Sequence, residues 1–160
     1  MGIFSSKTNL QLADHVDLNR YMGKWYVIAR TLNMLEKGNC NSSETYTMRP
    51  DGKIDVLYQA NKKSVDGPPT TLPQTLWSVS PNNSRMKAKL FIWPLIFDYL
   101  VLDIDPDYLW VVAGTKSLLW IMARQTQMDP QLFNELVSRC KAKGYDVSKL
   151  ERVTHKQVSK

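Results

Sequence analysis

The chain has 160 residues and a formal net charge of +6, with 43% hydrophobic and 22% charged residues. This length is typical of one domain with a single core, and the composition excludes an intrinsically disordered chain. The most apolar stretch, residues 90–102, is interrupted by Pro94 and Asp98 and is too short for a membrane-spanning helix.

The N-terminus carries a candidate lipidation signal. Met1-Gly2-Ile-Phe-Ser-Ser6 fits the N-myristoylation pattern, with Gly2 as the acylated residue. Residues 1–16 lack the charged start and apolar run of a secretory signal, so we expect a cytoplasmic protein, peripheral at a membrane if Gly2 is acylated. One acyl chain anchors only weakly. The basic end of the chain, residues 139–160, is either a second membrane signal or a solvated tail.

The first strand follows the segment Asn19-Arg-Tyr-Met-Gly-Lys-Trp-Tyr26. Gly23 suits a tight approach of the backbone where a Cβ would clash. Trp25 buries a large apolar surface, provided that its indole N–H finds a partner. The pattern therefore predicts a turn at Gly23 and a core residue at Trp25, at the start of a strand over 25–32.

Strand-like runs separated by turn residues continue along the chain. Asp51-Gly52 between two such runs is a strong hairpin signal. Longer connections are expected at 33–42 and 57–73, the latter because of its polar residues and Pro68-Pro69. The expected strands are 25–32, 43–49, 54–60, 75–80, 86–92, 99–104, 108–113 and 118–124. This spacing is typical of an all-β, up-and-down antiparallel barrel or a sandwich.

One α-helix is predicted after the strands. Asp129 is its expected N-cap, Pro130 occupies the first turn, and Gly144 follows its end. Apolar residues recur at helical spacing between Leu132 and Cys140. We expect this stripe to pack on the outside of the barrel, which would leave the interior free.

Three ordered motifs resemble those of the lipocalins, which are small β-barrels that hold apolar ligands. These motifs are the segment 19–26, Asp103-Ile-Asp-Pro-Asp-Tyr108, and Leu119-Trp-Ile-Met-Ala-Arg124. The stretch 119–154 resembles the branch with bacterial lipocalins, plant temperature-induced lipocalins and apolipoprotein D. The resemblance implies an eight-stranded barrel with an open calyx over residues 14–155, between an arm (1–13) and a basic tail (156–160). It also implies structural roles for Gly23, Trp25 and Arg124, with Arg124 packed over the Trp25 ring.

Alternation along the strands predicts which side chains face the calyx. Apolar residues alternate with Lys87 and Lys89 in the fifth strand, and the other strands follow by parity and resemblance. The expected lining residues are Glu44, Tyr46, Met48, Val56, Tyr58, Met86, Ala88, Leu90, Leu118, Trp120 and Met122. The alternative is a barrel filled by its own side chains.

Glu44 is unusual because a carboxylate inside an apolar cup is costly unless it is paired or lies near water. It could meet the head group of a cationic or zwitterionic lipid, but we expect it at the solvated rim. A one-residue change in register would turn it outward. The apolar segment 91–97 is expected near the mouth, where it would contact a membrane, a dimer partner or the ligand.

The resemblance implies a protein that binds and transports or sequesters a fatty acid, lysophospholipid or similar lipid, in membrane maintenance or stress response. An enzyme acting on an isoprenoid or fatty-acid-like substrate is the alternative. The sequence contains no nucleophile elbow or zinc-protease motif, so we expect no catalytic residue, metal or cofactor. We also expect no nucleic-acid binding, a monomer or homodimer, and free thiols at Cys40 and Cys140, although their bridging cannot be judged from the sequence.

Overall fold

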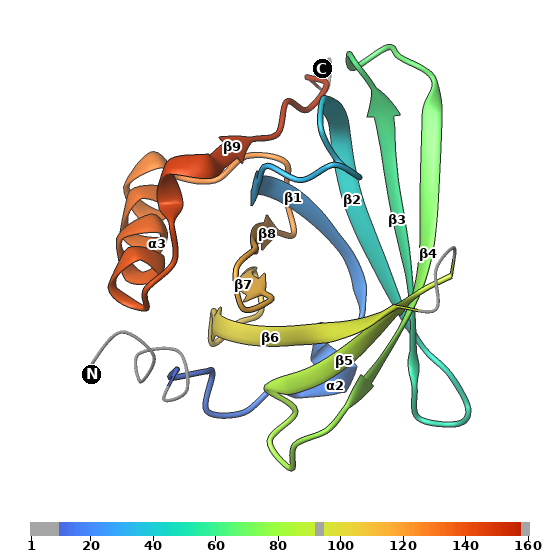
Figure 1. Cartoon of the computed structure of the whole chain (residues 1–160), viewed down its shortest axis with the longest axis vertical. Helices are drawn as coiled ribbons and strands as arrows, with labels where there is room; N and C mark the ends of the chain where they lie inside the picture. The colour runs from blue at the N-terminus through green and yellow to red at the C-terminus, as the bar shows by residue number, and fades with distance from the viewer. Residues whose placement is uncertain (1–9, 92–94, 158–160) are drawn as a thin grey trace.

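The computed structural model describes residues 10–91 and 95–157 and shows a closed antiparallel β-barrel (Figure 1). Successive strands from β2 to β8 are neighbours, and β1 pairs with both β8 and β2 to close the barrel. The strands are β1 (Gly23–Thr31), β2 (Asn39–Met48), β3 (Ile54–Lys62), β4 (Pro69–Ser78), β5 (Arg85–Leu90), β6 (Ile96–Ile104), β7 (Trp110–Gly114), β8 (Leu119–Ala123) and β9 (Leu150–Arg152). The eight-stranded up-and-down barrel is therefore confirmed.

Several strands, among them β2, β3 and β4, are longer than the sequence indicated. The long connection expected at 57–73 is wrong, because β3 continues to Lys62 and β4 begins at Pro69, opposite Asn61. Proline already has a φ suited to extended backbone, and at a strand's first residue its missing N–H costs little. The first loop is also shorter than expected, since β2 begins at Asn39.

Short elements that the sequence did not indicate complete the barrel. The one-turn helix α2 (Leu18–Tyr21) covers one end, where Asp17 caps it by accepting hydrogen bonds from two backbone N–H groups. The 3-10 helix η1 (Val147–Lys149) leads into β9, which pairs with residues 29–31 of β1. Periodicity could not reveal these elements because each has four residues or fewer.

The closed end is built around Trp25, whose side chain is fully buried. Its Nε1 donates a hydrogen bond to the carbonyl of Tyr21 at 2.8 Å, which satisfies the indole. The Arg124 guanidinium lies 3.6 Å from the Trp25 ring centroid and donates hydrogen bonds to the carbonyls of Arg20, Met22, Lys24 and Tyr108. Gly23 has φ +99°, a conformation that L-residues rarely adopt.

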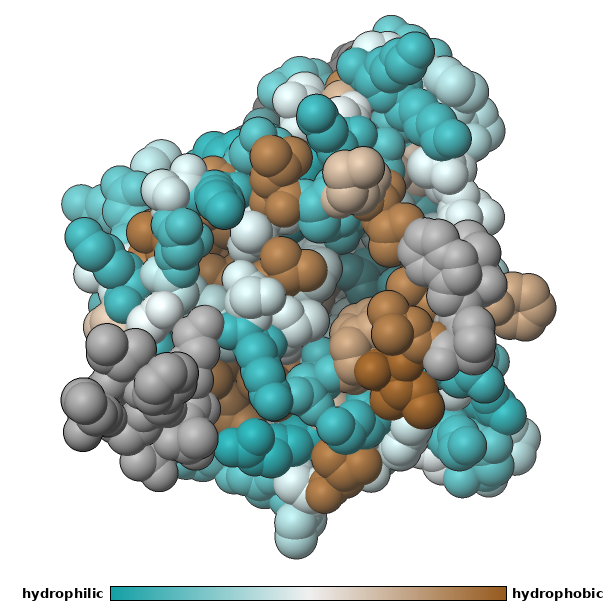
Figure 2. Space-filling view, viewed as in Figure 1, coloured by the Kyte–Doolittle hydropathy of each residue, from teal (hydrophilic) through white to brown (hydrophobic). Residues whose placement is uncertain are grey.

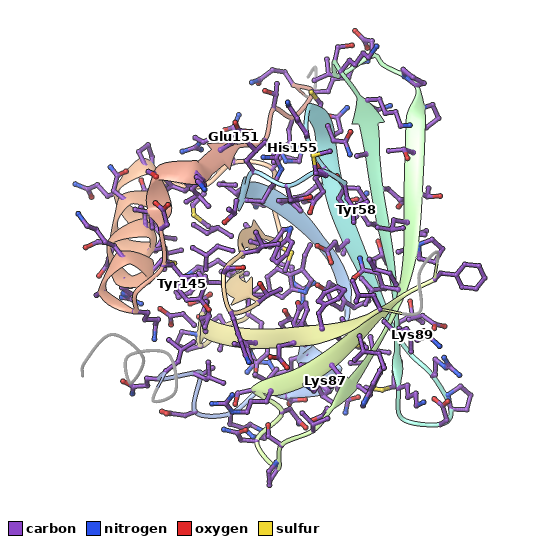
Figure 3. The ribbon with its side chains drawn as sticks, viewed as in Figure 1. Tyr58, Lys87, Lys89, Tyr145, Glu151 and His155 are labelled. Carbon is purple, nitrogen blue, oxygen red and sulfur yellow. The ribbon has the colours of Figure 1, made fainter. Side chains whose placement is uncertain are left out.

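The helix α3 (Pro130–Ala142) lies outside the barrel (Figure 1). Asp129 caps it by accepting a hydrogen bond from the Leu132 N–H at 3.1 Å. Leu136 and Cys140 are buried in a second apolar cluster between the helix and the barrel, where Tyr145 also lies (Figure 3). The helix therefore does not fill the barrel interior.

Three further expectations concern the termini and the thiols. Gly2 and the end of the tail lie outside the described residues. Within the residues described, no helix is long and apolar enough to cross a membrane. Cys40 and Cys140 are both free, and burial raises the pKa of the Cys140 thiol to about 11.

Candidate ligand-binding calyx

A cavity of about 360 Å³ lies inside the barrel, opposite the end that α2 closes. Loops at this open end and the inner faces of β2 to β8 supply its walls, and the hollow is visible in Figure 2 beside apolar side chains. Its lining consists of Asn33, Met34, Leu35, Glu36, Glu44, Tyr58, Leu72, Gln74, Leu90, Leu95, Phe97, Tyr99, Ala113, Thr115, Leu118, Trp120 and Met122. Most of these side chains are apolar or aromatic, as is typical of small-molecule sites.

The expected lining residues fall into two groups. Those that line the cavity are Glu44, Tyr58, Leu90, Leu118, Trp120 and Met122. Tyr58, for example, projects from β3 into the barrel (Figure 3). Those that do not line it, and pack instead with Trp25, are Tyr46, Met48, Val56, Met86 and Ala88. Parity identifies the inner face of a strand but not the depth at which the core ends and the cavity begins.

Several cavity residues escaped the sequence analysis. Leu72 and Gln74 belong to β4, whose first half was interpreted as a connection. Their alternate spacing could have revealed them once the strand was recognised. Asn33 to Glu36 come from the loop between β1 and β2, which folds over the cavity. No periodic signal marks such a loop.

Glu44 is inside the cavity rather than at a solvated rim, so that expectation is wrong. Its side chain is buried, with 7% of the residue exposed, and the β2–β3 register places it opposite Tyr58. Burial, followed by the nearby charge of Glu36, raises the pKa of Glu44 to about 8. The Tyr46 hydroxyl donates a hydrogen bond to Glu44 Oε1 at 3.0 Å, which opposes this rise only in part.

A chain of tyrosine hydroxyl groups leads to Glu44. Tyr46 lies 2.7 Å from the Tyr99 hydroxyl, which in turn lies 2.5 Å from the Tyr21 hydroxyl. When Tyr46 donates its one proton to Glu44, its oxygen accepts from the Tyr99 hydroxyl, whose oxygen in turn accepts from the Tyr21 hydroxyl. The three tyrosine hydroxyl groups thus approach Glu44 from the closed end of the barrel, and Glu44 also lines the cavity.

Glu36 is a second acidic residue of the cavity, and only 8% of it is exposed. Trp120 Nε1 and Asn33 Nδ2 donate hydrogen bonds to its Oε2 at 2.8 and 3.2 Å. Its Oε1 is the one buried side-chain polar atom without a hydrogen-bond partner in the part of the chain that the structure describes. Burial raises the pKa of Glu36, and the hydrogen bonds and the charge of Arg30 oppose that rise.

The described residues hold no group of three or more His, Cys, Asp or Glu side chains arranged to bind a metal ion. The polar groups of the cavity include the two carboxyl groups, the side chains that donate hydrogen bonds to them, and Tyr58, Gln74 and Thr115. Such a site can accept hydrogen bonds and balance a positive charge.

Comparison with known proteins agrees with this architecture. A lipocalin-like domain model matches residues 16–155. The chain is 33% identical to temperature-induced lipocalin-1 of Arabidopsis thaliana over 92% of this chain and 84% of that protein. It is 26% identical to the outer membrane lipoprotein Blc of Citrobacter freundii over 87% and 79% of the two chains, respectively. For apolipoprotein D of Macaca fascicularis the identity is 29%, over 89% and 79%.

Among solved structures, insecticyanin from the tobacco hornworm Manduca sexta superposes with a TM-score of 0.70 at 13% identity. The superposition covers 94% of this chain and 85% of insecticyanin. At this level of identity the likeness concerns the fold alone.

Proposed function

We propose, from the premise that this chain belongs to the lipocalin family, that its calyx carries a single-chain lipid. Members of the family bind small hydrophobic ligands and are generally binding or transport proteins. The observation that carries the proposal is a largely apolar cavity of about 360 Å³ that opens at one end of the barrel. An apolar tail gains free energy by leaving water for such a surface.

Among the lipids expected from the sequence, an ionised fatty acid is the least suited to this cavity. Its carboxylate would lie beside Glu36 and Glu44, whose pKa values are already raised, and the described lining of the cavity holds no cation to balance a further acidic group. A lysophospholipid or another single-chain lipid with a head group that is not an anion avoids this cost. We propose that such a carrier acts in membrane maintenance or in the response to stress.

Blocking the cavity tests the proposal. Leu90 is buried in the cavity wall, so Leu90→Arg should place a charged, longer side chain where the tail would lie. We expect the affinity for the neutral apolar probe N-phenylnaphthylamine, measured by its fluorescence, to fall by about a hundredfold or more. The matched control is Leu57→Arg on the outer face of β3, where the residue is partly exposed.

A second variant guards against misfolding of Leu90→Arg. Leu118 also lines the cavity but is only partly buried, so Leu118→Trp should narrow the cavity with little effect on folding. Unchanged probe affinity in both folded variants would contradict binding in this cavity. Native mass spectrometry of protein from its source cells would identify a co-purifying lipid.

We further propose that the open end of the barrel contacts a membrane when ligand is exchanged. Met34 and Phe91 are 92% and 82% exposed, so the protein buries little of either side chain. Leu35 and Leu95, also exposed, line the cavity from the same two loops. Exposed apolar side chains at one edge are typical of a surface that meets an apolar partner.

The membrane proposal predicts that Met34→Asp with Phe91→Asp weakens co-sedimentation with phosphatidylcholine vesicles. Leu109→Asp is the control, because Leu109 is exposed in the loop between β6 and β7, at the opposite end of the barrel. We expect about a tenfold loss of binding for the double variant and none for the control. Equal binding by all three proteins would contradict membrane contact through the open end.

A further inference from the structure

The hydrogen bonds that the two acidic residues of the calyx form do not satisfy both of their carboxyl groups. Neither carboxyl group forms an ion pair among the described residues, and Glu36 Oε1 has no hydrogen-bond partner at all. An unsatisfied buried acceptor destabilises the folded state, and more so when it carries charge. One unsatisfied acceptor and a second carboxyl group without an ion pair, beside one apolar cavity, indicate that a ligand supplies what the protein lacks.

The nearest cation of the protein does not supply it. Arg30 is buried, but its Nη1 binds Glu151 at 2.9 Å and its Nη2 donates to the backbone carbonyl of Glu36 at 3.1 Å. The guanidinium therefore holds the loop that carries Glu36 rather than the Glu36 carboxylate. The charge of Arg30 opposes the rise in the pKa of Glu36 that burial causes, but Arg30 forms no hydrogen bond with Glu36 Oε1.

The remaining groups around the two carboxyls come from β2, β3, β6 and β8 and from Asn33 in the loop between β1 and β2. Tyr46 donates a hydrogen bond to Glu44 and pairs with the Tyr99 hydroxyl, while Trp120 donates to Glu36. Tyr58, opposite Glu44, accepts a hydrogen bond from Asn39 at 3.0 Å. None of these side chains is a cation, so the carboxyls face a cavity with aromatic walls and no positive charge of its own.

We propose that the calyx recognises a single-chain amphiphile with a protonated primary amine as its head group, held by Glu36 and Glu44. The ammonium group would donate to Glu36 Oε1 and to the Glu44 carboxylate, and the faces of Tyr58 and Trp120 would offer it cation–π contact. The tail would lie along the apolar wall that includes Leu72 and Leu90. This inference rests on the proposed lipid-carrier function and adds the chemistry of the head group.

Alternative head groups satisfy the site less well. A neutral alcohol can donate one hydrogen bond to Oε1 but balances no charge. A quaternary ammonium balances the charge but donates no hydrogen bond. A carboxylate adds a third acidic group to the cavity.

Isothermal titration calorimetry with four probes of equal chain length separates these cases. The probes are dodecylamine, dodecanol, dodecyltrimethylammonium and dodecanoate, each below its micelle concentration and near neutral pH. We expect dodecylamine to bind about tenfold or more tightly than each of the others. Below about pH 8 the Glu44 carboxyl group is largely protonated, and it must release this proton to pair with the ammonium group. The affinity for dodecylamine should therefore rise with pH in this range, whereas the affinity for dodecanol should not.

Variants assign the effect to the two carboxyls. Glu36→Gln and Glu44→Gln should each weaken dodecylamine by about tenfold or more and leave dodecanol unchanged within about twofold. The control is Glu135→Gln, which removes the same charge from the exposed surface of α3. Thermal melting of each variant checks that it is folded.

The outcomes distinguish this inference from the function on which it rests. If no probe binds, the lipid-carrier function itself fails. If dodecanol or dodecanoate binds as tightly as dodecylamine, the carrier function stands and the amine head group is overturned. If dodecyltrimethylammonium binds as tightly, or both glutamine variants retain dodecylamine binding, hydrogen bonding to the two carboxyls is overturned.

Discussion

Trp25→Ala is expected to lower the free energy of unfolding by about 3–5 kcal/mol. The side chain is fully buried at the closed end, where its indole N–H is satisfied by the Tyr21 carbonyl. Its removal leaves a cavity and also takes away the aromatic face against which the Arg124 guanidinium lies. Urea denaturation followed by circular dichroism measures the change.

Trp77→Ala is the matched control for Trp25. Trp77 lies on β4, is only partly buried, and has Lys53 5.4 Å from its ring centroid. A partly exposed Trp should cost clearly less to truncate, because less apolar surface is lost. Similar midpoints for wild-type protein and Trp25→Ala would show that the closed end does not depend on this side chain.

The folded protein should lose stability as the pH rises from about 5 to about 8. Because Glu44 has a pKa of about 8 in the folded protein against an ordinary 4.5, the folded state retains a proton that the unfolded state has released. The unfolding free energy therefore falls with pH over this interval, by on the order of 4 kcal/mol from Glu44. Glu36, whose pKa is also raised by burial, acts in the same direction.

Glu44→Gln isolates this effect. The amide keeps an acceptor for the Tyr46 hydroxyl but cannot ionise, so the variant should match the wild-type protein near pH 5 and exceed its stability above pH 8. Denaturation across this range, with Glu135→Gln as the control, gives the difference curve. A constant difference between wild type and variant would mean that Glu44 titrates as it does in the unfolded chain.

Several elements of the barrel could be predicted from local physical constraints, whereas its closure, rather than a sandwich, was implied by the resemblance to lipocalins. Pro130 and Asp129 specify the start of a helix through backbone geometry and capping alone. The alternation of Met86 and Ala88 with lysines specifies which face of β5 points inward, since strand side chains alternate strictly. The prediction of a long connection at 57–73 was wrong because its prolines were interpreted as loop residues. In the structure Pro69 and Pro73 pair with Asn61 and Leu57 of β3.

The chain by itself, read with its resemblance to a known family, determined the sequential order of the strands, the inward face of β2, β3, β5 and β8, and the presence of a carboxyl group at position 44 on that face. Only the tertiary structure decided how deep each inward residue lies, which separates Tyr46 in the packed base from Tyr58 in the cavity wall. It also brought Glu36 from a loop to the same cavity as Glu44. Depth and loop placement depend on contacts between residues far apart in the chain, and strand periodicity carries no information about such contacts.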